Sequence, residues 1–333
     1  MSARDPVRAI ADAVLYEGYI LWPYRRSALK NQQRWTFGGV YPRAHSEGRE
    51  DDPWTVRTQV LVEAEPDARV EAGVRFLQVV RRDVVRRTPT GLEPVDELDV
   101  GDQRYLSWEE AVEREVALAP RSFGELAAGE SAPISIAAGE TTEELGAEGA
   151  IVRGWEALEV SLRASAEQLR EGLQRLTVTI ENTTPWQPGT RAEALKRTLC
   201  STHVVLRSEG SRFVSQADPP AELAADAACC RNEGLWPLLV GADGDHGTVL
   251  ASPIILEDYP RIAPESPGDL FDGGEIDQML VLNILSLTDE EKAEMRDSDP
   301  RAREILERTE ALSEQELMRL HGAVREFGMA RER

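Results

Sequence analysis

Three cysteines and a histidine are the side chains of this sequence best suited to chemistry. Cys200 and His203 are separated by two residues, and the adjacent pair Cys229 and Cys230 begins 26 residues after the histidine. Three thiolates and one imidazole could close a tetrahedral site for zinc or another transition metal. Adjacent cysteines on an extended strand point to opposite sides, however, and no Cys-x-x-Cys pair occurs. Two interpretations remain open: a metal site, or side chains that are buried or inert.

Other catalytic or cation-binding patterns are weak or missing. The acidic loops 241–247 and 268–278 offer oxygen ligands, but neither matches the twelve-residue calcium pattern, and both are typical of solvated turns. The chain lacks a dinucleotide-binding glycine motif, a phosphate loop, His-Glu-x-x-His and Gly-x-Ser-x-Gly. A catalytic Cys200–His203 pair would need an orienting third group and an oxyanion site, and the sequence indicates neither. These absences favour a protein that is not an enzyme.

The segment 16–41 differs chemically from the rest of the chain. It holds seven of the nineteen aromatic residues and four basic residues, with a single acid. Arginine and tyrosine are enriched at interface hot spots, because they bury area while keeping a polar end. The sequence therefore predicts a partner-binding surface made of Tyr24, Arg25, Arg26, Lys30, Asn31, Arg34 and Trp35. The alternative is that the rings pack in the core and the arginines pair with the chain's own acids.

Composition limits the possible partners and the compartment. The 333 residues carry a formal charge of −22, so the surface repels phosphate backbones and nucleic acid is not expected as a partner. No run of 18 apolar residues occurs, so no membrane span is expected. The first residues lack a signal-peptide pattern, and three cysteines argue against a disulfide framework. We expect a cytoplasmic protein.

Helices are predicted near both ends of the chain. Asp5 can cap a helix that starts at Pro6 and ends at Gly18, with an apolar stripe of Val7, Ile10, Ala11, Val14 and Leu15. After a loop at 260–274, three further helices are indicated by Thr288 with Glu291, Asp299 with Pro300, and Ser313 with Glu316. The last of these would carry a stripe of Leu317, Leu320, Val324 and Phe327.

The middle of the chain is typical of β-structure. Strands are predicted at 58–65 and 74–85, followed by an acidic loop at 91–101 and a short helix at 106–118 capped by Ser107. The stretch 132–183 is expected to form one β unit, because Leu176, Val178 and Ile180 alternate with polar residues. A hairpin at 203–215 and strands at 235–241 and 248–260 complete the prediction.

These elements predict an α+β fold: an N-terminal helix, a β-sandwich-like antiparallel body and a C-terminal helical segment. We expect two regions. Residues 1–260 form the β-rich body with its N-terminal helix, and residues 261–333 form a loop and helices packed on that body.

Three phrases carry a resemblance to a known group: LYEGYILWPYRRSALKNQQRWTFGGVYP, SPIILEDYPRIAPESPGDLFDGGEIDQML and DPRAREILERTEALS. With these phrases the chain resembles bacterial proteins whose genes lie near those of uptake nickel–iron hydrogenases. The resemblance implies an accessory role in the assembly, maturation or scaffolding of a redox metalloenzyme, with hydrogenase subunits as partners. It carries over no functional residues.

The favoured function is a non-enzymatic protein–protein interaction module. Two alternatives belong to other classes. One is a metal-binding protein or metal-dependent enzyme that uses Cys200, His203, Cys229 or Cys230. The other is a self-assembling structural subunit.

Overall fold

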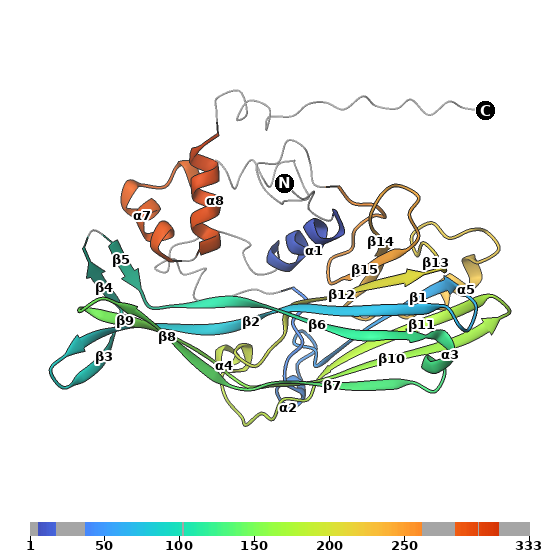
Figure 1. Ribbon diagram of the computed structural model, residues 1–333, viewed down its shortest axis with the longest axis horizontal. Coiled ribbons are helices and arrows are strands. Elements are labelled where there is room, and N and C mark those ends of the chain that lie inside the picture. The colour runs from blue at the N-terminus through green and yellow to red at the C-terminus, as the bar shows by residue number, and fades with distance from the viewer. Residues whose placement is uncertain (1–5, 18–36, 102, 262–283, 299, 313–333) are drawn as a thin grey trace.

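The computed structural model describes residues 6–17, 37–101, 103–261, 284–298 and 300–312 (Figure 1). Antiparallel strands dominate this part of the chain, and helices are few and short. The expected α+β class, with a sandwich-like antiparallel body between N-terminal and C-terminal helices, is confirmed. None of the helices in these residues combines the length and the apolar character needed to cross a lipid bilayer.

One sheet has five strands in the order β13-β1-β11-β10-β7. Their bounds are β1 (Thr55–Glu63), β7 (Glu130–Ile136), β10 (Leu158–Arg170), β11 (Leu173–Asn182) and β13 (Arg212–Phe213). The predicted β unit at 132–183 supplies three of these strands. Its other two, β8 and β9, belong to the second sheet, so the unit is divided between the two layers.

The second sheet has eight strands and is organised around β2 (Arg69–Thr88), which runs along the long axis of the molecule (Figure 1). The main path is β14-β15-β12-β2-β9-β8, and β3 and β6 also pair with β2. The other strands are β3 (Gly91–Val95), β6 (Trp108–Ser122), β8 (Gly139–Leu145), β9 (Gly149–Trp155), β12 (Cys200–Glu209), β14 (Trp236–Leu239) and β15 (Thr248–Ser252). A separate ribbon pairs β4 (Glu97–Val100) with β5 (Gln103–Leu106).

The core lies between the two sheets. Leu176, Val178 and Ile180 of β11 are buried there with Val74 and Phe76 of β2, while the residues between them on β11 are partly exposed. This alternation confirms the predicted inward row, because successive side chains of a strand point to opposite faces. Burial of these faces is the main term that stabilises the sandwich.

Helices cover the sheets on two sides. In Figure 1, α1 (Pro6–Glu17), α7 (Asp289–Ser298) and α8 (Pro300–Glu310) lie on one side, and α2 (Arg43–Ser46) and α4 (Arg191–Leu195) lie on the other. Two more short helices, α3 (Phe123–Leu126) and α5 (Ala224–Ala228), lie at the end where the five-stranded sheet is found. The predicted stripe of α1 is buried: Val7, Ile10, Ala11 and Val14 pack against residues of β12, β14 and β15, and Leu15 enters a neighbouring cluster.

The predicted cap of α7 is confirmed. The backbone N–H of Thr288 donates to Glu291 at 2.7 Å, and the N–H of Glu291 donates back to the hydroxyl of Thr288. Helix α8 begins at Pro300 as expected, and α7 contacts β5. The last predicted helix, with Ser313, Glu316 and its apolar stripe, lies outside the described residues, as does most of the predicted loop at 260–274.

Two sequence predictions between residues 91 and 118 were wrong. The expected loop at 91–101 forms β3 and β4, and the expected helix at 106–118 is strand β6. Residues of β6 pair with β2 from Trp108 opposite Arg82 to Ser122 opposite Arg69, with one register shift between Val70 and Ala72. This pairing overrides the local helix preference of the glutamates and alanines. Ser107 caps no helix; its hydroxyl donates to the carbonyl of Val95 at 2.6 Å.

The predicted hairpin at 203–215 was also wrong in its pairing. Strand β12 pairs with β2 and β15, whereas β13 pairs with β1 in the other sheet. The turn at Gly210 therefore connects the two layers. Phe213, which follows it, is fully buried between them. The segment after the turn thus buries the Phe213 ring between the sheets and does not form the strand pairing with β12 that the short turn suggested.

Candidate ligand-binding cleft

A cleft of about 840 Å³ opens beside α2 and α4. Its walls come from the loop 37–53, from Arg191 of α4, and from Trp236 and Pro253 next to the ends of β14 and β15. Small-molecule sites in proteins commonly measure about 300–1,000 Å³ and combine apolar walls with a few polar groups. The cleft has that size, and its lining joins aromatic and apolar side chains to five charged ones.

Backbone bonds fix the loop that forms the floor of the cleft. Val40 and Leu199 exchange two backbone hydrogen bonds, of 2.8 and 3.1 Å, and the N–H of Tyr41 donates to the carbonyl of Pro53 at 2.8 Å. Gly38 has φ +58°, and a Cβ at this position would lie 2.5 Å from Cβ of Pro253. Glycine is therefore required where the two walls meet.

Four side chains form a hydrogen-bonded network at the cleft, in which Tyr41, His45 and Asp52 are buried and Arg191 is half-exposed. Nε2 of His45 lies 3.0 Å from Oδ2 of Asp52. Arg191 donates to the same carboxylate through Nη2 at 2.9 Å and through Nε at 3.1 and 3.2 Å. Nη2 of Arg191 also donates to the hydroxyl of Tyr41 at 2.6 Å. The ring of His45 stacks on Tyr41 and meets the edge of Trp186.

The start of α4 explains how Arg191 reaches this network. Thr190 accepts from the backbone N–H of Glu193, and Glu193 accepts from the backbone N–H of Thr190, so the two residues form a capping box. The box fixes the first turn of α4. Arg191 is the first residue of that turn, and its half-exposed side chain bends back to Asp52.

The network keeps Asp52 ionised. Burial by itself raises the pKa of this carboxyl, but hydrogen bonds from Arg191 and His45 outweigh it and hold the pKa below its usual value. A nucleophilic triad would need a hydroxyl or thiol at the second ring nitrogen of the histidine. Nδ1 of His45 is instead buried without a hydrogen-bond partner among the described residues. The arrangement therefore suits a rigid floor for binding rather than acyl transfer.

Replacing Asp52 by Asn tests this role of the network. We expect Asp52→Asn to lower the free energy of unfolding at pH 7 by about 1–3 kcal/mol, because the charged partner of Arg191 is lost. Chemical denaturation measures the change. The matched control is Asp51→Asn, an exposed neighbour, which should stay within about 0.5 kcal/mol of wild type. Equal effects of the two variants would contradict the structural role of Asp52.

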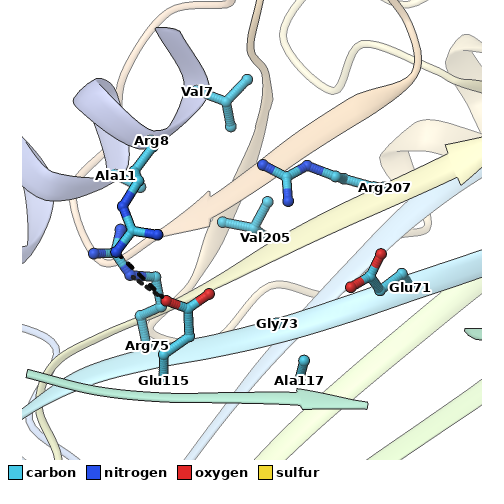
Figure 2. Close-up of a pocket in the computed structure, with 10 residues that line it drawn as sticks. All are labelled: Val7, Arg8, Ala11, Glu71, Gly73, Arg75, Glu115, Ala117, Val205 and Arg207. Atoms are coloured by element: carbon cyan, nitrogen blue, oxygen red, sulfur yellow. Dashed lines mark ion pairs between the residues drawn. The ribbon is translucent and has the colours of Figure 1, made fainter. Parts of the chain in front are cut away.

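A second, smaller cavity of about 130 Å³ lies between α1 and the eight-stranded sheet (Figure 2). In Figure 2 the guanidinium groups of Arg8 and Arg75 converge on Glu115, and both N–O separations are 3.8 Å. Arg75 is only 4% exposed and is also paired with Asp12 of α1 at 2.6 Å and with Glu113. These pairs hold α1 on the sheet, and they leave little net charge for a ligand.

The predicted metal ligands are not brought together. Cys200 is buried in the cluster of Tyr41, Leu77 and Leu195, and His203 is fully buried on the same strand. Cys230 packs in a different cluster around Leu61 and Leu173, next to the exposed Cys229.

No group of three or more metal-ligating side chains occurs among the residues that the structure describes. Burial also raises the pKa of Cys230 to about 11, which keeps the thiol protonated. Cys200 and Cys230 pack in separate apolar clusters. The four side chains of the proposed zinc site are therefore not brought together in the described part of the chain.

The predicted partner surface, from Tyr24 to Trp35, lies outside the described residues. The structure instead draws attention to residues that sequence reasoning did not single out, namely Tyr41, His45, Asp52, Arg191 and Trp236. The sequence carries a signal for two of them: Tyr41 closes the aromatic segment 16–41, and Arg191 lies within Thr190-Arg-Ala-Glu193, which has the spacing of a capping box.

A search of protein-family models finds no match to this chain, and a search of curated proteins finds none either.

Proposed function

We propose that this protein is a cytoplasmic, non-enzymatic recognition module and that the cleft holds a segment of a protein partner. The observation that carries the proposal is the cleft itself. Its floor is fixed by backbone bonds and by the His45–Asp52–Arg191 network, and its walls present Phe37, Trp236 and Pro253. Aromatic side chains in a rigid concave surface are typical anchoring points for a partner.

The proposed partner class is a redox metalloenzyme such as an uptake nickel–iron hydrogenase, for which the protein would act as an accessory or assembly factor. Support for this class comes from the sequence resemblance. Support for a non-enzymatic role comes from the chemistry of the cleft, where the buried Asp–His pair faces aromatic rings rather than a nucleophile.

The test is capture of the tagged full chain from its host, with mass spectrometry of the proteins that stay bound. We expect hydrogenase subunits to be retained by wild type and lost, by roughly ten-fold or more, with Phe37→Ala or Trp236→Ala, since hot-spot truncations cost 2 kcal/mol or more. The control is Leu92→Ala on β3, a similarly exposed apolar residue that does not line the cleft.

Each outcome of this test decides a separate part of the proposal. Thermal unfolding of the variants shows whether either truncation affects folding. Because two positions are changed separately, the test still works if one of the variants does not fold. Equal retention by the cleft variants and the control would contradict a role for the cleft. Absence of hydrogenase subunits from the wild-type capture would contradict the partner class.

A further inference from the structure

Arginine side chains cover most of the tryptophan rings in the described part of the chain. The guanidinium of Arg43 lies 4.5 Å from the ring centre of Trp54. Arg114 lies 5.6 Å from Trp155 in the same way. Arg197 lies over Trp186 and Arg191 over Tyr41, at 5.7 and 5.3 Å. A cation within about 6 Å of an aromatic face is attracted by the negative potential of the ring.

Trp236, in the wall of the cleft, is not covered in this way. Among the described residues no guanidinium or ammonium group lies over its ring, although the ring is only partly buried. The edge strand β14 holds its backbone, with Trp236 paired to Ser252 of β15. Because no cation of the described residues lies over it, the partly exposed ring of Trp236 is available to a cation from outside the chain.

Two exposed carboxylates line the same cleft. Glu50 and Asp51 are exposed at its rim and form no ion pair among the described residues, in contrast to the adjacent Asp52. Arg191 is bound to Asp52, whereas Arg49 donates to the backbone carbonyl of His45, which leaves its positive charge in place. Two arginines against three carboxylates give the lining of the cleft a net negative charge, on a chain whose formal charge is −22.

We propose that the cleft takes the side chain of an arginine from the partner segment, with its guanidinium over Trp236 and its N–H groups towards Glu50 and Asp51. Arginine fits better than lysine because its planar group can stack on an aromatic face and bond carboxylates in pairs. This inference rests on the proposed function, since it names the chemical group that the partner would place in the cleft.

The test compares two peptides of nearly the same shape that differ in charge and in hydrogen-bond donors. Acetyl-Gly-Arg-Gly-amide carries the guanidinium, and the citrulline analogue has nearly the same shape without the charge. Calorimetric titration of the full chain should show at least roughly ten-fold weaker binding of the citrulline peptide, as expected for a desolvated cation–π contact with charged hydrogen bonds. Equal affinities of the two peptides would overturn the proposal.

Variants of the rim separate a specific site from general attraction to an acidic protein. Glu50→Gln with Asp51→Asn, or Trp236→Leu alone, should weaken the arginine peptide by about ten-fold. The control is Glu47→Gln, on the same loop and equally exposed, which does not line the cleft and should change the affinity by less than about two-fold. An effect of the control as large as that of the rim variant would overturn the proposal.

The two sets of experiments can fail separately. Loss of hydrogenase subunits with Phe37→Ala, combined with equal binding of the arginine and citrulline peptides, would leave the proposed function intact and overturn the arginine inference. Specific arginine binding without any hydrogenase subunit in the capture would overturn the proposed partner class and leave the arginine inference intact.

Discussion

Replacing Asn182 by Leu should lower the free energy of unfolding by about 2–4 kcal/mol, although no charge is removed. Asn182 is fully buried at the end of β11, and its amide connects three chain segments. Nδ2 donates to the carbonyls of Val40 and Arg197, both at 2.8 Å, and Oδ1 accepts from the N–H of Thr184 at 3.0 Å. Leucine would leave the Thr184 N–H and the Arg197 carbonyl without this partner in a buried position.

Asn182→Asp gives a sharper test of the same contacts. Its carboxylate would still accept from Thr184 but would face two carbonyl oxygens, so we expect a loss at pH 7 at least as large as that of Asn182→Leu. Because the folded state would raise the pKa of the new carboxyl, protonation in acid should recover part of the stability. Chemical denaturation at pH 7 and pH 5 measures both effects.

The matched control is Asn232→Asp. The side-chain oxygen of Asn232 accepts from the N–H of Gln59 at 2.7 Å and from the hydroxyl of Thr58 at 3.2 Å. A carboxylate can accept both bonds, so this variant should lose less than about 1 kcal/mol. If Asn182→Asp proved as stable as this control, the amide would not connect the three segments as described.

These contacts show why the sequence could predict the layers but not the cleft. Short-range periodicity was enough for β11 and for α1, because one face of each is buried and its apolar residues recur at fixed spacing. The class of fold follows from such patterns. The partners of Asn182 lie 142 and 15 residues away, and no local pattern records distances of that kind.

Strand β6 illustrates where local preference misleads. Its glutamates favour a helix in isolation, yet Glu110 pairs with Arg82 and Arg153, and Glu113 pairs with Arg75. The arginines belong to β2 and β9, so the acids acquire their role only when the sheet forms. Long-range pairing therefore decides the structure of this segment, and the sequence alone could not predict it.

The cleft contains residues from a segment that composition singled out and residues from distant parts of the chain. Its aromatic residues Phe37 and Tyr41 belong to the segment 16–41 that composition singled out, whereas the predicted partner surface, Tyr24 to Trp35, lies outside the described residues. Asp52, Arg191 and Trp236 come from three distant parts of the chain and join it only through the folding of the sandwich. Folding has the opposite effect on Cys200 and Cys230: their spacing suggested a metal site, but the two side chains pack in separate clusters.

The second large effect is expected from His203 and concerns the stability of the fold in acid. The ring is fully buried on β12, opposite Arg75 of β2. Burial, together with the neighbouring positive charge of Arg75, lowers the pKa of His203 from 6.5 to about 4, despite a bond between Nδ1 and the carbonyl of Ser201 at 3.1 Å. Nε2 has no hydrogen-bond partner among the described residues, so nothing there stabilises a second proton.

The sign of the pH dependence follows from this shift. Between pH 6.5 and about 4 the unfolded chain binds a proton at this histidine and the folded chain does not, so stability falls as the pH falls. A pKa shift of this size lowers the free energy of unfolding by about 2 kcal/mol between pH 8 and pH 5. The contribution of Asp52 is separate, because its lowered pKa means that its stabilisation is lost only below about pH 4.

Replacing His203 by Leu should therefore flatten the stability profile between pH 8 and pH 5. The variant loses the bond to Ser201 and is expected to be less stable than wild type at pH 8, but the difference between the two proteins should shrink by about 2 kcal/mol on going to pH 5. Denaturation curves at five or six pH values measure the slope. The control is His246→Gln, which leaves His203 in place and should retain the wild-type slope. A slope unchanged by His203→Leu would mean that other groups cause the acid sensitivity. Burial of the neutral imidazole would then not be the reason that stability falls in acid.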